Sequence, residues 1–416
     1  MLKKGTNFIL ALDRNTRMQE LNEFITTSKK RDINSITINV KPSRTYSNVC
    51  APIAGLIEYY RELGISIQVK YPKGDYVRHT RFWAPIAIEE CAEAEKFYPL
   101  DKVWTFQTSE GVSALVSAYI LELRKTELIE EGVIESIEWC LNEVMDNVLQ
   151  HAGTGKGYVM AQIHKQAKTF AFCVFDSGVG IYNSLKSTKH HPEKPIDAIT
   201  LALQERITRD EKIGQGNGLW GLSSIISESN GQMEVSSGGA KYRVLNGNII
   251  TKKEGGFILS SEKGTAYLDI RLDYNKKINI TKALGGYTPS DIWLENLMGD
   301  DESYILKVAE IASGTGTRQS AIKLRNIAMN ISNIEKKVVV FDFEGINLIS
   351  SSFADELIGK IIAEKGLMYF LSAYKMKNLT PMNISIMNRS IEQRMAQKYY
   401  VDLFDDYDIE IEEDIG

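Results

Sequence analysis

Thr169-Phe-Ala-Phe-Cys-Val-Phe-Asp-Ser-Gly-Val-Gly180 is the stretch of sequence that decides the fold. Its first seven residues are almost wholly apolar, which predicts a buried strand over 169–175. The strand runs into Asp176, and the two glycines that follow allow backbone to approach a planar ring closely. An acid at a strand end is suited to accept a hydrogen bond from the exocyclic amine of adenine. Asp-Ser-Gly is equally good chemistry for a plain turn, so both interpretations stay open.

The helix expected before this strand carries a stripe of polar side chains. Glu143 and Asn147 are four residues apart, and His151 follows after four more, so the three lie along one side of a helix ending at His151. A carboxylate can orient or deprotonate a water or a hydroxyl group. An Asn carbonyl one turn away is a hard oxygen ligand suited to Mg²⁺. Taken alone, a solvated helix edge would look the same.

A glycine-rich run, Gly214-Gln-Gly-Asn-Gly-Leu-Trp-Gly221, leads into an apolar helix from Leu219. Glycines at a helix N-terminus expose N–H groups and the positive end of the helix dipole to phosphate oxygens. The run satisfies GxGxxG formally, but a charged stretch precedes it where a dinucleotide-binding turn needs a hydrophobic strand. Gly153-Thr-Gly-Lys156 is not a P-loop, because Gly157 follows the lysine where Ser or Thr is required.

These motifs lie in the middle of a chain of 416 residues, which is long enough for several domains. Residues 1–107 are expected to form an N-terminal α/β module. Residues 108–275 hold the motifs, and strands with helices between their pairs predict a mixed sheet with helices on one face. A linker is expected at 276–300, followed by a second α/β unit with an acidic tail at 301–416.

The C-terminal unit has a strand–helix–strand pattern of its own. Strands are expected at Val338–Phe343 and at Leu367–Leu371, with a helix over Phe353–Ile362 between them. The span from Ile36 to Gly64 has the same length and order of elements as the span from Val338 to Gly366. The N-terminal module therefore shares its topology, which two ordinary βαβ units also reach by chance.

Composition and charge exclude several classes of protein. With 43% hydrophobic and 25% charged residues, the chain is neither collagen-like nor largely disordered. A net charge of −5 provides no global basic field, so direct nucleic-acid binding is not expected. Four widely spaced cysteines fit a reducing compartment. We see no leader-like apolar segment and no stretch of 18 apolar residues, and expect a cytoplasmic protein that does not enter a membrane.

Taken in order, the motifs resemble the GHKL family of ATP-binding proteins, which includes gyrase, heat-shock-90, histidine-kinase and MutL-type ATPases. Within that family the sequence is most similar to the bacterial anti-sigma-factor serine kinases. The resemblance covers residues 110–275 and depends on the helix with Glu and Asn, the DxGxG strand end, a long polar stretch, the GxGxG helix and a Gly-Thr pair before the last strand. It implies an α/β sandwich with a mixed sheet that binds ATP and Mg²⁺.

The resemblance also implies roles for single residues. Glu143 corresponds to the general base, Asn147 to the Mg²⁺ ligand and Asp176 to the contact with adenine. The segment Ile181–Ile213 corresponds to a mobile lid over ATP. The other nucleotide-binding positions that the resemblance implies are His151, Gly178, Gly180, Gly214, Gly216, Gly218 and Thr265.

Two departures bear on the kind of activity. Gln150 stands where histidine kinases usually carry a basic residue. His79, in Arg-His-Thr-Arg-Phe-Trp, lacks the acidic neighbour that a phosphoacceptor histidine needs. We therefore do not expect autophosphorylation on histidine.

The last region resembles a STAS-like domain, the family that includes the anti-sigma-factor antagonists, most clearly over 338–357. In the antagonists a serine at the start of the helix accepts phosphate, and the corresponding residue here is Ser351 or Ser352. Added charge at that position would suit the helix dipole and change a docking surface. Phe353 stands where the antagonists usually have Gly, and Ser350 where Asp is common. Plain capping of the helix by serine is the alternative.

Together the resemblances predict a bacterial signalling regulator whose nucleotide state controls the binding of a protein partner through the STAS-like domain. A serine kinase that uses Glu143 as its base is the sharpest form of this prediction. The alternative is a slow ATPase that forms a homodimer on binding ATP, as the gyrase and MutL relatives do, for example in defence against phage. A third interpretation, a pseudo-enzyme in which ATP is only structural, is disfavoured by the intact Glu143.

Overall fold

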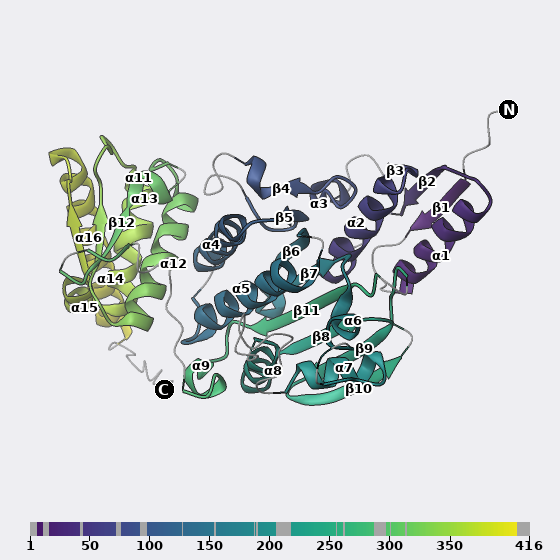
Figure 1. Cartoon of the computed structure of the whole chain (residues 1–416). Coiled ribbons are helices and arrows are strands. Elements are labelled where there is room, and N and C mark those ends of the chain that lie inside the picture. The colour runs from purple at the N-terminus through teal and green to yellow at the C-terminus, as the bar shows by residue number, and fades with distance from the viewer. Residues whose placement is uncertain are drawn as a thin grey trace, which may run out of the picture. The chain divides into compact units, whose positions relative to one another are not determined.

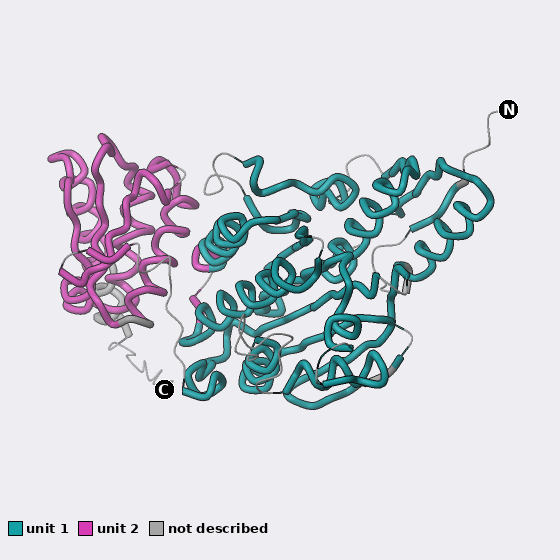
Figure 2. Tube along the Cα trace, in the orientation of Figure 1, with its two compact units in different colours: residues 1–123, 130–289 teal, residues 124–129, 290–416 magenta. Residues whose placement is uncertain are grey.

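The structure is a computed structural model of the chain, and its compact parts fall into two units (Figure 2). Unit 1 comprises Met1–Leu123 and Glu130–Pro289, and unit 2 comprises Arg124–Ile129 and Ser290–Gly416. The predicted N-terminal module lies in unit 1, and so does the predicted nucleotide region except for residues 124–129. The residues that the structure describes are 6–10, 16–41, 45–71, 76–91, 98–126, 128–153, 155–186, 188, 190–204, 218–254, 256–260, 263–286, 297–299, 301–312 and 314–405.

Unit 1 is built around an eight-stranded mixed sheet (Figure 1). Neighbouring strands pair antiparallel except β4 and β5, which pair parallel at one edge. These two strands precede residue 107 in the sequence, yet they belong to this sheet. The strand expected over 169–175 is confirmed. In order across the sheet the strands are β10 (Asn248–Glu254), β9 (Ala240–Leu245), β8 (Gln232–Ser237), β11 (Ala266–Asp273), β7 (Thr169–Asp176), β6 (Gly157–His164), β5 (Trp104–Phe106) and β4 (Ile86–Ala87).

The helix that ends at His151 is confirmed, and it packs on the sheet together with the helix that follows the glycine run. Its buried positions recur every three or four residues, as an amphipathic helix requires. Two further helices lie within the segment expected to be a polar lid. The helices of this part are α4 (Ser109–Thr126), α5 (Val133–His151), α6 (Gly180–Lys186), α7 (Pro195–Ala202), α8 (Gly218–Ser229) and the short α9 (Ile280–Ala283).

The prediction of helices on one face of this sheet is wrong, because α2 (Ser47–Glu62) packs against β6, β7 and β11. Gly55 of α2 lies so close to Phe175 that a Cβ would overlap the aromatic ring. Cys173 and Phe175 share a hydrophobic cluster with α2, and alternate residues of β7 point to the opposite face. Burial on both faces explains why β7 is an almost continuous apolar run rather than an alternating one.

A buried polar cluster lies where the start of α2 meets the sheet. Asn48 Nδ2 donates to Asp269 Oδ2 at 3.3 Å, and Arg271 Nη2 lies 3.6 Å from the same oxygen. Glu234 is directly opposite Asp269 across β8 and β11. Burial raises the pKa of Asp269 to about 6, an effect that the charge of Arg271 partly offsets and that of Glu234 strengthens. Between about pH 4 and pH 6, Asp269 is therefore mostly protonated in the folded chain and mostly ionised in the unfolded chain.

Asp269→Asn is expected to flatten the pH dependence of stability. Between about pH 4 and pH 6 the folded state holds more protons than the unfolded state, so the free energy of unfolding falls as pH rises. Above pH 6 the neutral Asn removes a buried charge, and we expect a gain on the order of 2 kcal/mol. Urea unfolding of both proteins at pH 4.5 and pH 8 measures this. Parallel pH profiles for the two proteins would contradict the assignment.

The N-terminal part of unit 1 and the core of unit 2 each contain a three-stranded parallel sheet in sequence order. The shared topology seen in the sequence is thus present at both ends of the chain. The N-terminal sheet consists of β1 (Thr6–Leu10), β2 (Ser35–Val40) and β3 (Ser66–Lys70), with α1 (Thr16–Lys30) and α2 as its crossovers. The sheet of unit 2 consists of β12 (Tyr304–Lys307), β13 (Val339–Asp342) and β14 (Tyr374–Lys377).

The prediction of a strand at Leu367–Leu371 is wrong, because this segment lies in helix α15 (Leu367–Ala373). Phe370 is buried there, whereas Met368 and Leu371 are 79% and 61% exposed. The short apolar run therefore has one buried side, and the strand that pairs with β13 comes next, at β14. The other helical elements of unit 2 are α11 (Val308–Ile311), α12 (Arg318–Glu335), α13 (Ser351–Ala354), a π-helical turn (Asp355–Gly359), α14 (Lys360–Lys365) and α16 (Pro381–Asp405). None of the helices in the described ranges combines the length and the apolarity that crossing a membrane would require.

Candidate functional site

Helices α5 and α8 bring Glu143, Asn147 and Gly218 together. A Cβ built on Gly218, the first residue of α8, would lie 2.5 Å from Glu143 Oε2 and 3.5 Å from Asn147 Nδ2. The start of α8 is thus bare backbone facing a carboxylate and an amide. A side chain at Gly218 would collide with the Glu143 carboxylate, so the contact between α8 and α5 requires glycine at this position.

Trp139 determines how closely α8 approaches α5. The indole ring lies against Gly221, where any Cβ would overlap it. Sequence reasoning treated Gly221 only as the end of the glycine run and did not single out Trp139. The signal was available, since Trp139 precedes Glu143 by one helical turn on the same stripe.

The Glu143 carboxylate lies in surroundings that favour its protonated form and raise its pKa. Burial raises its pKa above the ordinary range, and the neighbouring charge of Asp146 adds to the effect. Burial also raises the pKa of Asp146. A carboxylate with a raised pKa takes up a proton from a water or hydroxyl group more readily.

Asp176 lies at the end of β7 and is only 5% exposed. Its Oδ1 accepts a hydrogen bond from the backbone N–H of Gly178 at 2.8 Å. Burial raises the pKa of Asp176 to about 7, although that hydrogen bond and the charge of Lys263 lower it in part. No described residue donates a hydrogen bond to Oδ2 in the structure, so this oxygen can accept one from a ligand.

The turn after Asp176 is fastened to the end of α5. The backbone N–H of Val179 donates to the carbonyl oxygen of Ala152 at 3.0 Å. A Cβ on Gly178 would overlap that same carbonyl, so this position requires glycine. The turn that follows Asp176 therefore packs directly against the residue after α5, the helix that carries Glu143.

Thr265 lies beside this turn, as the resemblance implies. Its backbone N–H donates to the carbonyl oxygen of Gly178 at 3.1 Å, and Thr265 is buried. Ser237, which sequence reasoning missed, joins the pieces: its hydroxyl donates to Thr265 O at 2.7 Å and accepts from Ile181 N at 2.8 Å. The sequence signal for this bridging role of Ser237 is limited to its position at the end of a strand, before two glycines.

The remaining predicted positions are placed as follows. His151 is the last residue of α5 and is half-buried. Gly180, with φ of +74°, begins α6, and its position leaves no room for a side chain beside Thr265 O. Gly214 and Gly216 lie outside the described residues, as does the part of the predicted lid after residue 204.

A metal ion would find few protein ligands here. Among the residues that the structure describes, no group of three or more His, Cys, Asp or Glu side chains is placed to hold one. Asn147 is the only predicted ligand, so a magnesium ion at this position would depend on phosphate and water oxygens. Mg²⁺ commonly binds in that way.

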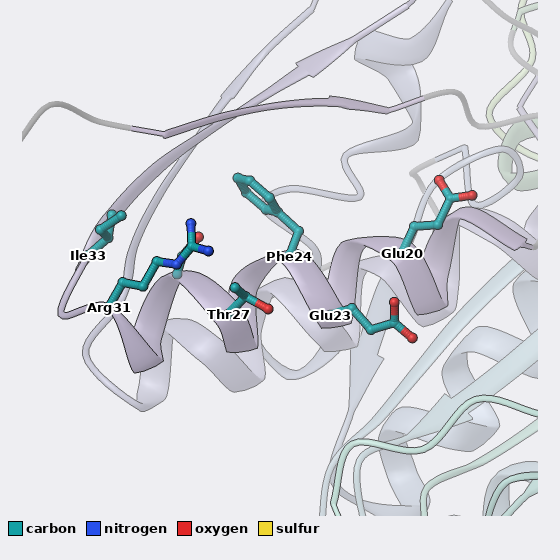
Figure 3. A pocket seen from close by; sticks show the side chains of 7 residues that line it. Glu20, Glu23, Phe24, Thr27, Arg31 and Ile33 are labelled. Carbon is teal, nitrogen blue, oxygen red and sulfur yellow. The ribbon is translucent and has the colours of Figure 1, made fainter.

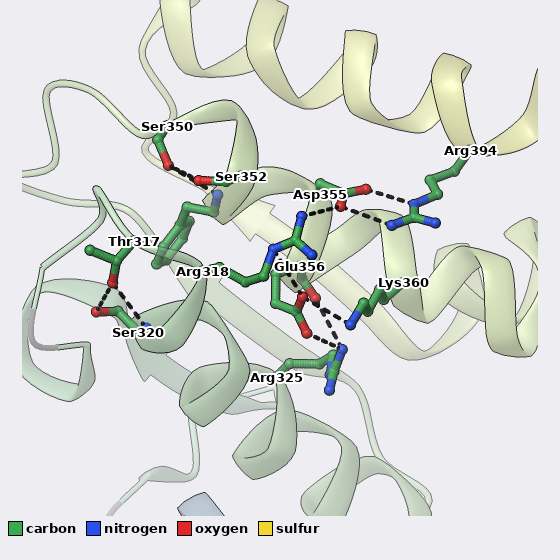
Figure 4. Close-up of polar contacts among 11 residues, drawn as sticks. Thr317, Arg318, Ser320, Arg325, Ser350, Ser352, Asp355, Glu356, Lys360 and Arg394 are labelled. Carbon is green, nitrogen blue, oxygen red and sulfur yellow. Dashed lines mark hydrogen bonds and ion pairs between the residues drawn. The ribbon is translucent and has the colours of Figure 1, made fainter.

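The predicted phosphoacceptor serines lie at the start of α13 in unit 2 (Figure 4). Ser350 is the residue that caps the helix, since its Oγ accepts from the N–H of Phe353 at 3.0 Å. Ser352 Oγ lies 3.0 Å from Ser350 Oγ, and Ser351 is exposed. The serine that caps the helix is therefore Ser350, one residue before the two predicted acceptors.

A network of charges follows in the next turn (Figure 4). Glu356 is fully buried in the π-helical turn, and Asp355 precedes it. Arg325 Nη1 lies 2.6 Å from Glu356 Oε1, and Arg318 Nη2 lies 3.4 Å from Asp355 Oδ2. The cations of this network are Arg318, Arg325, Lys360 and Arg394.

A shallow groove runs along α1 (Figure 3), away from all predicted site residues. Phe24 and Ile33 supply its apolar lining, and Glu20, Glu23 and Arg31 give it mixed charge. These side chains do not form a convergent set around one point. The groove therefore does not support a second candidate site.

Comparison with known families bears on unit 2. Residues 320–383 match the model of a STAS-like domain of unknown function (DUF4325). This segment begins in α12, includes β13 and β14, and ends at the start of α16. A STAS-like domain at the C-terminus is therefore present, which is compatible with a signalling or regulatory role. A comparison of the whole sequence with curated proteins found no match.

Proposed function

We propose that unit 1 binds an adenine nucleotide with Mg²⁺ and that the nucleotide state controls a protein partner of the STAS-like domain. One observation carries the proposal: segments far apart in the sequence meet at two adjoining points. Glu143 and Asn147 meet the start of α8, and the turn after Asp176 meets Thr265. The GHKL-type resemblance implies this grouping, and an ordinary solvated helix edge or strand turn does not require it.

The residues suit the two ends of a nucleotide. Asp176 Oδ2 would accept the exocyclic amine hydrogen of adenine, and the N–H of Gly178, bonded to Oδ1, would hold the carboxylate in place. The N–H groups at the start of α8 would face the phosphates. A magnesium ion bound with the nucleotide would neutralise phosphate charge, and Asn147 is the side chain placed to hold it.

Glu143 is the residue that would act on an attacking hydroxyl. With its raised pKa it would orient the O–H of a water or of a serine and take up the proton as that oxygen bonds to the γ-phosphorus of ATP. The bond from the γ-phosphorus to the bridging oxygen breaks at the same time, and ADP leaves. Ser351 or Ser352 is the acceptor that the STAS-like resemblance suggests, in this chain or in a partner copy, and Ser351 is the exposed one of the two. Transfer to serine and hydrolysis thus use the same base.

Glu143→Gln is expected to separate binding from turnover. The amide keeps the size of the side chain but cannot take up a proton, so we expect release or transfer of the terminal phosphate to fall about 10²- to 10⁴-fold. Nucleotide affinity should change less than about threefold. Labelled ATP with phosphate release and gel readouts measures turnover, and calorimetry measures binding. Glu228→Gln, at the other end of α8 in an exposed pair with Lys282, is the matched control. Equal turnover in wild type and Glu143→Gln would remove Glu143 as the base.

Calorimetry of the full chain with ATP analogues and magnesium tests the proposal itself. We expect saturable heat with adenine nucleotides and much weaker binding of guanine nucleotides, because guanine presents a carbonyl oxygen where adenine presents an amine. No heat with any adenine nucleotide would end the proposal.

A further inference from the structure

Helix α12 of the STAS-like domain holds a piece of chain that comes from the middle of the sequence. Residues Arg124–Ile129 belong to unit 2, whereas the residues before and after them belong to unit 1. They form the last turn of α4 and the start of the connection to α5. The contact that holds them is therefore internal to unit 2.

Asn326 binds the end of α4. Its Nδ2 donates to the carbonyl oxygens of Lys125 and Thr126, at 3.2 Å each. The last carbonyls of a helix have no partner within that helix, so Asn326 acts as a cap from another element. At 7% exposure the amide is sheltered from water that could replace it.

Asn330, one turn further along α12, uses both ends of its amide. Its Nδ2 donates to Arg124 O at 3.0 Å, and its Oδ1 accepts from the N–H of Ile129 at 2.9 Å. Asn330 is 1% exposed. Because Asn330 is buried and both its amide nitrogen and its amide oxygen are hydrogen-bonded, it holds residues 124–129 at one position along α12.

The segment leads into the helix of the candidate site after three residues. Glu130 N donates to Tyr274 O at 3.1 Å, and Ile278 N donates to Glu131 O at 2.9 Å. Gly132, in the left-handed region at φ of +79°, ends the connection, and α5 begins at Val133. Only Glu130, Glu131 and Gly132 separate the segment held by α12 from the helix that carries Glu143.

We propose that Asn326 and Asn330 are positioning residues through which the STAS-like domain regulates the candidate site on α5. A partner that shifts α12 would move the α4–α5 connection and with it the start of α5. By linkage, a nucleotide that fixes α5 would change the affinity of the partner by the same factor. Both asparagines lie within the matched STAS-like segment. The regulation of nucleotide binding rests on the proposed function, whereas the mechanical coupling does not.

Asn326→Asp tests the coupling in the full chain. The carboxylate cannot donate, and it would face two carbonyl oxygens, so the contact with α4 is lost. Asn333→Asp is the matched control, because Asn333 is exposed on the same helix and its Oδ1 only accepts a bond, from Tyr369. Asn326→Ala is a milder variant should the Asp variant fail to fold.

Amide hydrogen exchange of the ligand-free proteins is the first measurement. We expect Asn326→Asp to speed exchange at least several-fold both in residues 124–129 and in α5, with Asn333→Asp like wild type. Faster exchange in 124–129 alone, with α5 unchanged, would overturn the proposal, because a merely local cap would behave in that way.

Calorimetry with an ATP analogue and magnesium is the second measurement. We expect the Kd of Asn326→Asp to differ from that of wild type by about fivefold or more, in the usual range of coupling between sites. An unchanged Kd beside a wild type that binds would overturn the regulatory claim. A wild type that binds no nucleotide ends the proposed function instead, and the exchange experiment still decides the coupling.

Discussion

Asp176→Asn is expected to weaken adenine-nucleotide binding strongly while making the folded protein more stable at neutral and alkaline pH. The Asn side chain can still accept the N–H of Gly178 through its oxygen. Its other end then becomes a donor that faces the donor amine of adenine. Losing a hydrogen bond to a charged group costs about 1.5–3 kcal/mol, and opposing two donors adds to it, so we expect affinity to fall about 100-fold.

The stability change has the opposite sign because of burial. Asp176 in the folded protein has a pKa of about 7, well above that of an exposed Asp. Between about pH 4 and pH 7 the folded state binds more protons than the unfolded state, so the free energy of unfolding of the wild type falls as pH rises. The neutral Asn avoids this loss, and the gain at pH 8 should be on the order of 3 kcal/mol.

The two readouts together make the test specific. Calorimetry with an ATP analogue gives the Kd, and urea unfolding at pH 5 and pH 8 gives stability. Asp273→Asn is the matched control. Asp273 is the last residue of β11 and pairs with Thr169, at the opposite end of the β7–β11 pair from Asp176. A variant that loses affinity and stability together would indicate misfolding rather than a lost contact with adenine. A variant that binds as tightly as wild type would exclude Asp176 from the site.

The parts of unit 1 that sequence predicted best are those whose burial leaves a regular pattern. The apolar run of β7 and the striped α5 carry patterns of their own. The predicted strand matches β7 to within one residue at each end, and α5 ends at His151 as predicted. The position of Gly218 beside Glu143 was anticipated only through family resemblance, because no local pattern tells which distant helix start will meet α5.

Other parts were missed for identifiable physical reasons. The β9–β10 hairpin carried the Asn246-Gly247 signal of a tight turn, and both residues have positive φ as that turn requires. Its strands are polar and lie at the sheet edge, so they lack the apolar run that drew attention to β7. The apolar segment at 367–371 was too short to distinguish a strand from a helix by periodicity. The cover that α2 places on the second face of the sheet depends on a contact between distant segments.

Glu356→Ala is expected to destabilise unit 2 by about 3–5 kcal/mol, the usual cost of leaving a buried partner charge unmatched. The Glu356 carboxylate is fully buried, with Arg325 at 2.6 Å, Lys360 at 3.0 Å and Arg318 at 3.7 Å. Arg325 is the cation that suffers most, because its side chain is only 17% exposed and cannot regain full hydration.

A double variant separates the net contribution of the charge pair to stability from the cost of leaving one of its charges unpaired. Glu356→Leu with Arg325→Met replaces the pair by apolar groups, and we expect it to recover most of the stability that Glu356→Ala loses. Glu310→Ala is the control, since its pair with Lys307 is exposed and should contribute less than 1 kcal/mol. Amide exchange of β13, in the core of unit 2, reports the stability of this unit separately from that of unit 1. Because Glu356 lies in the turn that follows the exposed Ser351, a loss below 1 kcal/mol in Glu356→Ala would mean that the network serves neither to hold this helix start nor to fix Arg318 beside it.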